Sequence, residues 1–172
     1  AQFPDYDRYD VGAPALNPTS MITGMDSWDA WFNSVPVDQR PMPAGAANKD
    51  EYWYAMPWAA TAWIRGAAPN KKTSRGYNLF VGDSNLPSAG GLSSSSHIVI
   101  GTVIGLNELY KLGWSAEEII EAGYAERGAC GTYGAIADHA AIVLCQFGQL
   151  GRLGLQPTAM KGQFNLPEGL RM

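Results

Sequence analysis

The sequence has little of what marks several large classes of protein. It holds two cysteines, Cys130 and Cys145, too few for a disulfide framework in 172 residues, which favours two reduced thiols. It also has no long apolar run, because its longest weakly charged stretch, 86–108, contains a proline, several glycines and four consecutive serines, and so no membrane span is predicted. The sequence also has no excess of positive charge, since it contains 12 Lys+Arg and 16 Asp+Glu. This balance argues against nucleic acid and anionic lipid as partners.

Aromatic and turn-forming residues are abundant instead. Six Trp, eight Tyr and five Phe exclude a disordered chain, and 20 Gly with 11 Pro in no regular period predict many turns. The length suits one domain with a sizeable core. The first residues carry neither an initiator Met nor a secretory signal, so we expect a cytoplasmic chain that is an internal piece of a longer protein.

Helix and strand signals are mixed along the chain. Residues 1–50 are loop-rich, with one short helical turn over 27–32 capped by Ser27. Beyond them we predict helices over 58–65 (opened by Pro57 and closed by Gly66), 97–112, 115 to about 128, and 135–147, with strands over 76–82 and 150–155. Because strands and helices do not alternate as βαβ units, the expected fold class is α+β.

The most informative segment is the Gly/Ser run from Gly90 to Ser96, which passes directly into a predicted helix. Glycines let the backbone approach a ligand, and successive N–H groups at a helix start bind anions such as phosphate. Serine hydroxyls can also bind phosphate oxygens or Mg²⁺. Taken alone, the run is equally compatible with a flexible linker. The unbroken step into a helix argues against a linker.

A second segment places two carboxylates, Glu126 and Asp138, on either side of a glycine-rich turn. One acid would end a helix and the other would begin the next, so that both could converge on one metal–phosphate site. Two unrelated surface acids would give the same pattern, and Asp138 could simply match the dipole of its helix. By itself this spacing therefore decides nothing.

Together the two segments resemble the GHMP kinases, the superfamily of galactokinase, homoserine kinase, mevalonate kinase and phosphomevalonate kinase. Leu86-Pro87 followed by 91–96 (Gly-Leu-Ser-Ser-Ser-Ser) is similar to the second signature of the family in its galactokinase-like form. Ala125-Glu126 and the stretch 134–139 resemble the galactokinase Ala-Glu…Gly-Ile-Met-Asp-Gln segment at the same Glu-to-Asp spacing. The resemblance runs from about residue 58 to residue 155.

The resemblance implies a fold, a reaction and a set of site residues. The fold would be the GHMP-kinase N-terminal domain, like the second domain of ribosomal protein S5: a mixed sheet with packed helices, truncated here, spanning 1–172. The reaction would be transfer of a phosphoryl group from ATP to the 1-hydroxyl of a sugar, with Mg²⁺ as cofactor. Implied roles are phosphate binding by Gly90, Gly91, Ser93, Ser94 and Ser95; nucleotide contact by Trp58; metal binding by Ser95 and Glu126; substrate contact by Gly134; and catalysis and substrate contact by Asp138.

Departures from the family pattern qualify these expectations. The N-terminal Gly-Arg-Val-Asn…Glu-His…Asp segment that carries sugar-binding groups has no counterpart, nor has the late glycine-rich motif. Since substrate-positioning groups are missing, the chain alone is expected to show little turnover. His139 replaces the galactokinase Gln, which leaves the identity of the sugar open. The alternative to an active kinase is a non-catalytic homologue that binds sugar and nucleotide as a sensor, or a degenerate kinase homologue.

Overall fold

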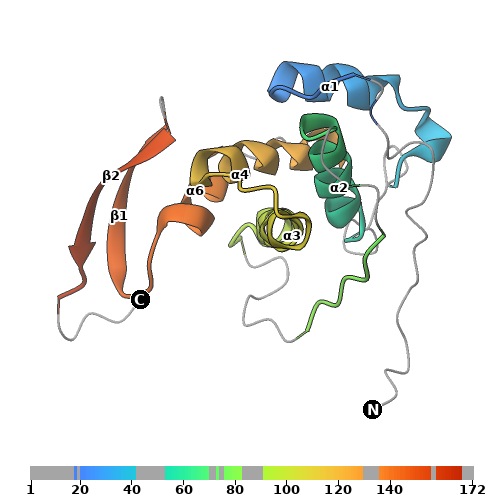
Figure 1. Ribbon diagram of the computed structural model, residues 1–172. Helices are drawn as coiled ribbons and strands as arrows, with labels where there is room; N and C mark the ends of the chain where they lie inside the picture. Colours follow the sequence, from blue (N-terminus) through green and yellow to red (C-terminus); the bar gives the residue numbers. More distant parts are fainter. Residues whose placement is uncertain are drawn as a thin grey trace, which may run out of the picture.

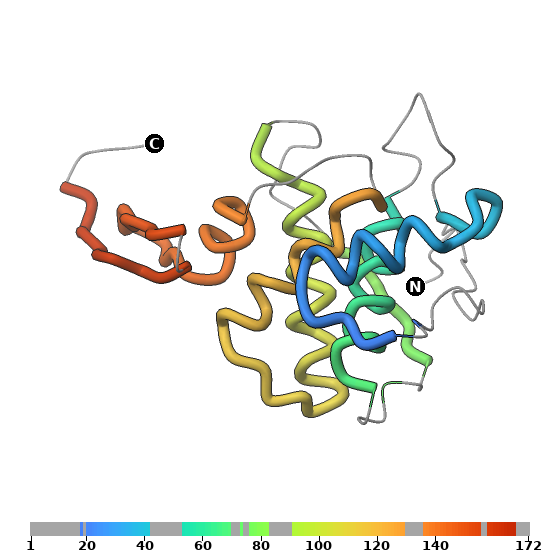
Figure 2. The backbone as a smooth tube through the Cα atoms, turned by 90° about the horizontal axis from the view of Figure 1, so that it is seen from above, coloured from blue at the N-terminus to red at the C-terminus, as the bar shows by residue number. Residues whose placement is uncertain are grey.

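The computed structural model describes residues 18, 20–41, 53–69, 73, 76–82, 91–129, 136–155 and 158–167. Helices form a body, and a two-stranded hairpin projects from it beyond α6 (Figure 1 and Figure 2). In chain order the elements are α1 (Met25–Ser34), η2 (Val37–Gln39), α2 (Ala55–Ala67), α3 (Ser94–Tyr110), α4 (Ala116–Ala122), η4 (Gly123–Ala125), α5 (Glu126–Ala129), α6 (Ile136–Leu144), β1 (Gln149–Leu155) and β2 (Thr158–Asn165). The α+β class predicted from the sequence is therefore confirmed.

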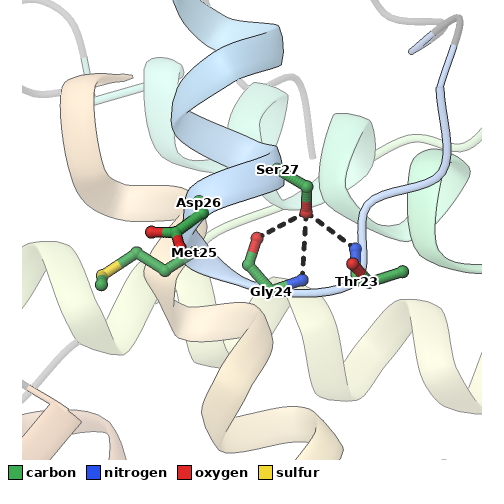
Figure 3. A pocket seen from close by; sticks show the side chains of 5 residues that line it. All are labelled: Thr23, Gly24, Met25, Asp26 and Ser27. Carbon is green, nitrogen blue, oxygen red and sulfur yellow. Dashed lines mark hydrogen bonds between the residues drawn. The ribbon is translucent and has the colours of Figure 1, made fainter.

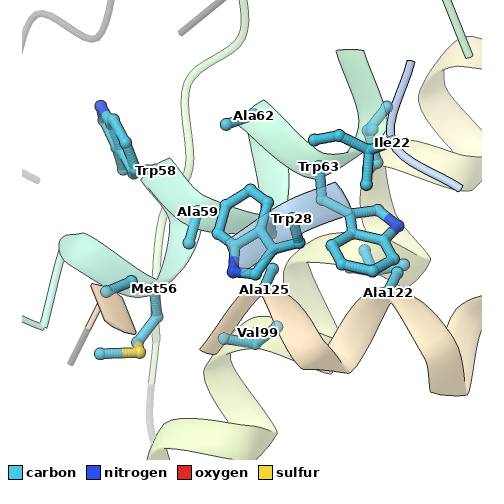
Figure 4. Packing of buried hydrophobic residues seen from close by; sticks show 14 of the residues in the cluster. Ile22, Trp28, Met56, Trp58, Ala59, Ala62, Trp63, Val99, Ala122 and Ala125 are labelled. Atoms are coloured by element: carbon cyan, nitrogen blue, oxygen red, sulfur yellow. The ribbon is translucent and has the colours of Figure 1, made fainter. Parts of the chain in front are cut away.

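Five aromatic side chains form the centre of the body. We call them the aromatic core: Trp28, Trp31 and Phe32 of α1, with Trp58 and Trp63 of α2. The ring centroids of Trp28 lie 5.0 Å from Trp31 and 5.6 Å from Trp63, and Trp31 stacks on Trp58 at 5.8 Å. Alanines of α2 and of the α4–α5 region fill the space around them (Figure 4). Small residues at these positions let the helices approach closely enough to exclude water.

Helix α2 is longer than the sequence predicted. It begins two residues before Pro57, whose missing N–H costs nothing in a first helical turn. Gly66 lies inside the helix rather than closing it, so the expected end at Gly66 is wrong. A Cβ on Gly66 would lie 2.6 Å from the side chain of Ile22, so that glycine serves close packing of the segment before α1. Nearly every residue of α2 is buried, as expected of a helix that is apolar on all sides.

Sheet structure differs more from the expectation. The segment 76–82, predicted as a strand, pairs with no other strand among the residues described. It is attached to α2 through the Tyr77 hydroxyl, 2.5 Å from Thr61 Oγ1. The predicted strand at 150–155 is present as β1, but its antiparallel partner β2 was not foreseen. Pairing runs from Gln149 opposite Asn165 to Leu155 opposite Thr158, and this hairpin is the sheet of the described part of the chain.

The connection from α4 to α5 positions one of the predicted acids. Ser115 and Glu118 form the predicted capping box at the start of α4: Glu118 N–H donates to Ser115 Oγ at 3.3 Å, and Ser115 N–H donates to Glu118 Oε2 at 2.7 Å. The chain then leaves the helical path at Arg127 and at Gly128, which has φ +78°. A Cβ on Gly128 would lie 2.8 Å from the ring of Phe32. Glycine thus permits the tight turn that follows Glu126.

Among the described residues, no helix combines the length and the apolar character needed to cross a bilayer.

Candidate functional site

The site predicted from the sequence is centred on the start of α3. Gly91 has φ +73° and Ser93 has φ +55°, so both residues adopt left-handed backbone conformations just before the helix. The first intrahelical bond runs from His97 N–H to Ser93 C=O at 3.1 Å. Within the described residues, no side chain caps the N–H groups of this first turn, although serines commonly do so. A start of this kind can bind an anion through its backbone N–H groups.

The hydroxyl of Ser93 is engaged elsewhere. It donates a hydrogen bond to Asp138 Oδ2 at 2.7 Å, although the two residues are 45 positions apart in the sequence. Asp138 lies in the first turn of α6, where the positive end of the helix dipole favours an ionised carboxylate. The hydrogen bond uses one carboxylate oxygen, and Oδ1 remains chemically able to accept a proton or a hydrogen bond from a ligand hydroxyl.

Glu126 is held by the same turn of α3. Ser95 Oγ donates to its Oε1 at 2.5 Å, and Ser96 Oγ donates to its Oε2 at 2.7 Å. His139, the residue after Asp138, brings its Nε2 to 3.2 Å from the same Oε2. We call these six residues the serine–carboxylate cluster: Ser93, Ser95, Ser96, Glu126, Asp138 and His139. Three parts of the chain therefore meet at one helix start.

The surroundings of Glu126 set its charge. Burial raises the pKa of the Glu126 carboxyl, but hydrogen bonds from His139, Ser95 and Ser96 lower it by more than burial raises it. The pKa of Glu126 therefore lies below its ordinary value. The carboxylate is consequently ionised at neutral pH and can only accept hydrogen bonds. His139 Nε2 must then carry the proton that it shares with Glu126.

Magnesium was predicted to bind at Ser95 and Glu126, and their donor atoms are of the right kind. A hydroxyl and a carboxylate oxygen are hard ligands of the type that Mg²⁺ prefers, and they are adjacent here. The described residues hold no group of three or more His, Cys, Asp or Glu that could bind a metal by themselves. Magnesium in nucleotide sites commonly uses one or two carboxylates and completes its shell with phosphates and water. The donor set therefore fits a metal that arrives with a nucleotide.

The other predicted site residues are placed as follows. Ser94 is the first residue of α3 and is half-buried, while Gly91 is exposed. Gly90 and Gly134 lie outside the described residues. Trp58 is 4% exposed and belongs to the aromatic core, where it stacks on Trp31. This placement gives no support to an adenine contact by Trp58, and that role stays a prediction.

A surface pocket lies at a different helix start. It is lined by Thr23, Gly24, Met25, Asp26 and Ser27 at the beginning of α1 (Figure 3). Ser27 Oγ accepts from the N–H groups of Thr23 and Gly24 and donates to Gly24 C=O. Ser27 thus stabilises the turn from inside the helix rather than from the predicted cap position, which is occupied by Gly24.

Two members of the cluster had no role in the sequence prediction. Ser96 was noted only as the fourth serine of the run, and His139 only as a departure from galactokinase. Helical geometry could have indicated Ser96. The side chains of consecutive residues at a helix start are close enough for two serines to donate to the two oxygens of one carboxylate. His139 needed the packing of α6 against α3 and α4, which no local pattern encodes.

Comparison with known proteins agrees with this geometry. The family described as the GHMP kinases N terminal domain matches residues 58–146, slightly more than half of the chain and all six residues of the cluster. Neither the curated proteins nor the solved structures gave a match. A family match of this extent, over the segment that brings the serines and the two carboxylates together, shows that the chain belongs to the GHMP kinase family.

Proposed function

We propose that this chain provides the ATP-binding part of a galactokinase-like enzyme that phosphorylates the 1-hydroxyl of a sugar. The family membership supports a phosphotransferase at the coarse level. The observation that carries the finer proposal is the convergence of Asp138 and Glu126, from two different helices, on neighbouring serines of one helix start. Phosphoryl transfer requires such an arrangement of anion-binding N–H groups, a metal-binding carboxylate and an acceptor for the substrate hydroxyl.

Each part of the cluster has a defined task in this proposal. The N–H groups of the first turn of α3 would bind phosphate oxygens, and Gly90, Gly91, Ser93 and Ser94 keep the phosphate-binding role that the family resemblance implies. Ser95 and Glu126 would hold Mg²⁺, which neutralises phosphate charge when bound. Asp138, oriented by Ser93, would hold the sugar hydroxyl and accept its proton. Gly134, which is outside the described residues, keeps the role of substrate contact that the family resemblance implies.

A second function, binding without transfer, is favoured by one observation. Glu126 accepts hydrogen bonds from three protein groups, so the buried carboxylate is stabilised in the absence of any metal. A sensor that binds sugar and nucleotide would retain such a structure without needing turnover. The two functions differ in whether phosphate is transferred to a sugar at all, and in the kinase Asp138 would be needed for that transfer.

The substitution Asp138→Asn, together with an assay of transfer to sugars, distinguishes the kinase from the sensor. In an active kinase that contains these residues, we expect the variant to lower kcat about 10²–10⁴-fold, the usual cost of losing a positioned base, with little change in nucleotide affinity. Ser95→Ala should instead weaken the dependence of the rate on Mg²⁺. Release of ADP in the presence of a panel of monosaccharides measures both effects. Undiminished transfer by Asp138→Asn would remove Asp138 from the mechanism, and nucleotide binding with no transfer to any sugar would favour the sensor.

A further inference from the structure

The two oxygens of Glu126 lie in different surroundings. Oε1 accepts from Ser95 in a half-buried position, on the side where a metal was predicted. Oε2 accepts from Ser96 and contacts His139 in fully buried positions. Oε2 therefore points toward the fully buried side of the cluster, whereas Oε1 lies beside the Ser95 hydroxyl at the half-buried start of α3.

His139 is held rigidly in its position. The ring is 0% exposed, and a Cβ on Gly123 would lie 2.5 Å from its Nδ1, so the imidazole rests directly on the backbone of η4. Tyr124 contacts the ring edge-on, with centroids 6.2 Å apart. The ring cannot turn toward Gly123 without displacing the backbone of η4.

The orientation of His139 also has a cost. Its Nδ1 is buried and has no hydrogen-bond partner among the residues that the structure describes. Buried polar atoms are nearly always paired, and an unpaired one destabilises the folded state. Since Nε2 is the ring atom that finds a partner, the contact with Glu126 is the polar interaction that this orientation gains.

We propose that His139 and Ser96 are positioning residues that fix Glu126 through Oε2, so that Oε1 and the Ser95 hydroxyl are presented together to a divalent cation. The inference rests on the proposed function, because it assumes a metal at Ser95 and Glu126. His139 and Ser96 touch neither the metal nor the substrate in this account. They act by restricting the carboxylate to one rotamer, as hydrogen-bonding partners behind a metal ligand generally do.

Binding of Mn²⁺ in place of Mg²⁺ tests the proposal without any need for turnover. Electron paramagnetic resonance measures free Mn²⁺ while the 172-residue chain is titrated in the presence of ATP. We expect His139→Leu and Ser96→Ala each to weaken Mn²⁺ binding about 10–100-fold, the usual effect of removing such a partner. His139→Gln, which keeps an N–H donor in place of Nε2, should recover most of the affinity. A purely structural role for the imidazole would not predict this rescue.

Thr102→Val provides the matched control. Thr102 is buried on the same helix as Ser96, but its hydroxyl donates to Ile98 C=O rather than to Glu126, so its variant should leave Mn²⁺ binding unchanged. Circular dichroism verifies that every variant is folded, and Ser96→Ala, the smallest change, keeps the test valid where His139→Leu does not fold. One outcome would overturn the positioning role alone. In it, Glu126→Gln loses Mn²⁺ binding, while Ser96→Ala, His139→Gln and a folded His139→Leu all bind Mn²⁺ like the wild type. Equal Mn²⁺ binding by wild type and Glu126→Gln would instead overturn the metal site and, with it, the proposed function.

Discussion

The aromatic core is buried and the serine–carboxylate cluster is partly so, with Ser96, Glu126 and His139 buried and the rest half-buried, yet the two are built on opposite principles. The core consists of large rings in contact with alanines, and its stabilisation is largely the removal of apolar surface from water. The cluster consists of hydroxyls, two carboxylates and an imidazole, joined by hydrogen bonds of 2.5 to 3.2 Å. Packing of rings tolerates small shifts, whereas hydrogen bonds to a buried charge do not.

The difference separates stability from function. The core should determine whether the chain folds, because burial of aromatic side chains dominates the favourable free energy of such a domain. The cluster should determine what the folded chain binds, and its buried charge makes it sensitive to pH and to a metal.

Truncation of the core should have the largest effect. Trp63 is 3% exposed and packs against Trp28, so Trp63→Ala should lower the free energy of unfolding by about 3–5 kcal/mol. Urea denaturation followed by circular dichroism measures the change. Trp53→Ala is the matched control, since that ring is 37% exposed and its loss should change stability by less than about 0.5 kcal/mol. Equal effects of the two substitutions would show that the rings do not form the stabilising core.

Removal of the buried charge should have an intermediate effect that depends on pH. Glu126→Gln should cost about 1–3 kcal/mol at neutral pH, because hydrogen bonds to a charged group are lost. The hydrogen bonds from His139, Ser95 and Ser96 hold the folded pKa of Glu126 below the ordinary 4.5, even though burial raises it. The unfolded carboxyl therefore takes up its proton first, and the stabilisation is complete above about pH 4.5 and disappears as the pH falls through the folded pKa.

Denaturation of both proteins between pH 3 and pH 7 measures this dependence. The difference in stability between wild type and Glu126→Gln should shrink below pH 4.5. Glu108→Gln is the control, since the carboxylate of Glu108 forms an exposed ion pair with Lys111, and a pair of this kind contributes little. A difference that stays constant over the whole range would contradict the charge-based account of the cluster.

Loss of a helix cap outside both regions should have the smallest effect. Ser115→Ala removes the hydroxyl that accepts from Glu118 N–H, and about 1 kcal/mol of stability should be lost. Nucleotide and Mn²⁺ binding should not change, because the capping box lies outside the cluster. A loss of binding comparable to that of Ser96→Ala would mean that affinity follows overall stability, and that the comparison between the two regions fails.

Local sequence signals predicted the helices well and the sheet poorly. The capping box at Ser115 and Glu118 marks a helix start through interactions within four residues, so the sequence alone sufficed. The segment 76–82 has the aromatic and β-branched residues of a strand, but strand formation requires a partner, which the sequence does not specify. Gly66 illustrates the same limit, because close packing against Ile22 and helix termination both favour glycine.

The site was predicted in outline from the Gly/Ser run and the two acids. The structure brings Ser93 to Asp138 and Ser95 to Glu126, as the predicted convergence requires, whereas the catalytic and binding roles themselves remain predictions. The two residues that the sequence prediction missed are Ser96 and His139. Both are polar, and their positions become buried only when α3, α4 and α6 pack together. Burial of a polar side chain is a tertiary property.

The central claim is that the start of α3 binds the phosphates of a nucleotide. Titration of the isotope-labelled chain with Mg²⁺ and a non-hydrolysable ATP analogue, followed by amide NMR, tests it most directly. The account predicts the largest chemical-shift changes at the N–H groups of Ser94, Ser95 and Ser96, with smaller ones at Glu126 and Asp138, and none at Trp63. Shifts confined to the Thr23–Ser27 pocket, or no saturable shifts at millimolar analogue, would contradict the account.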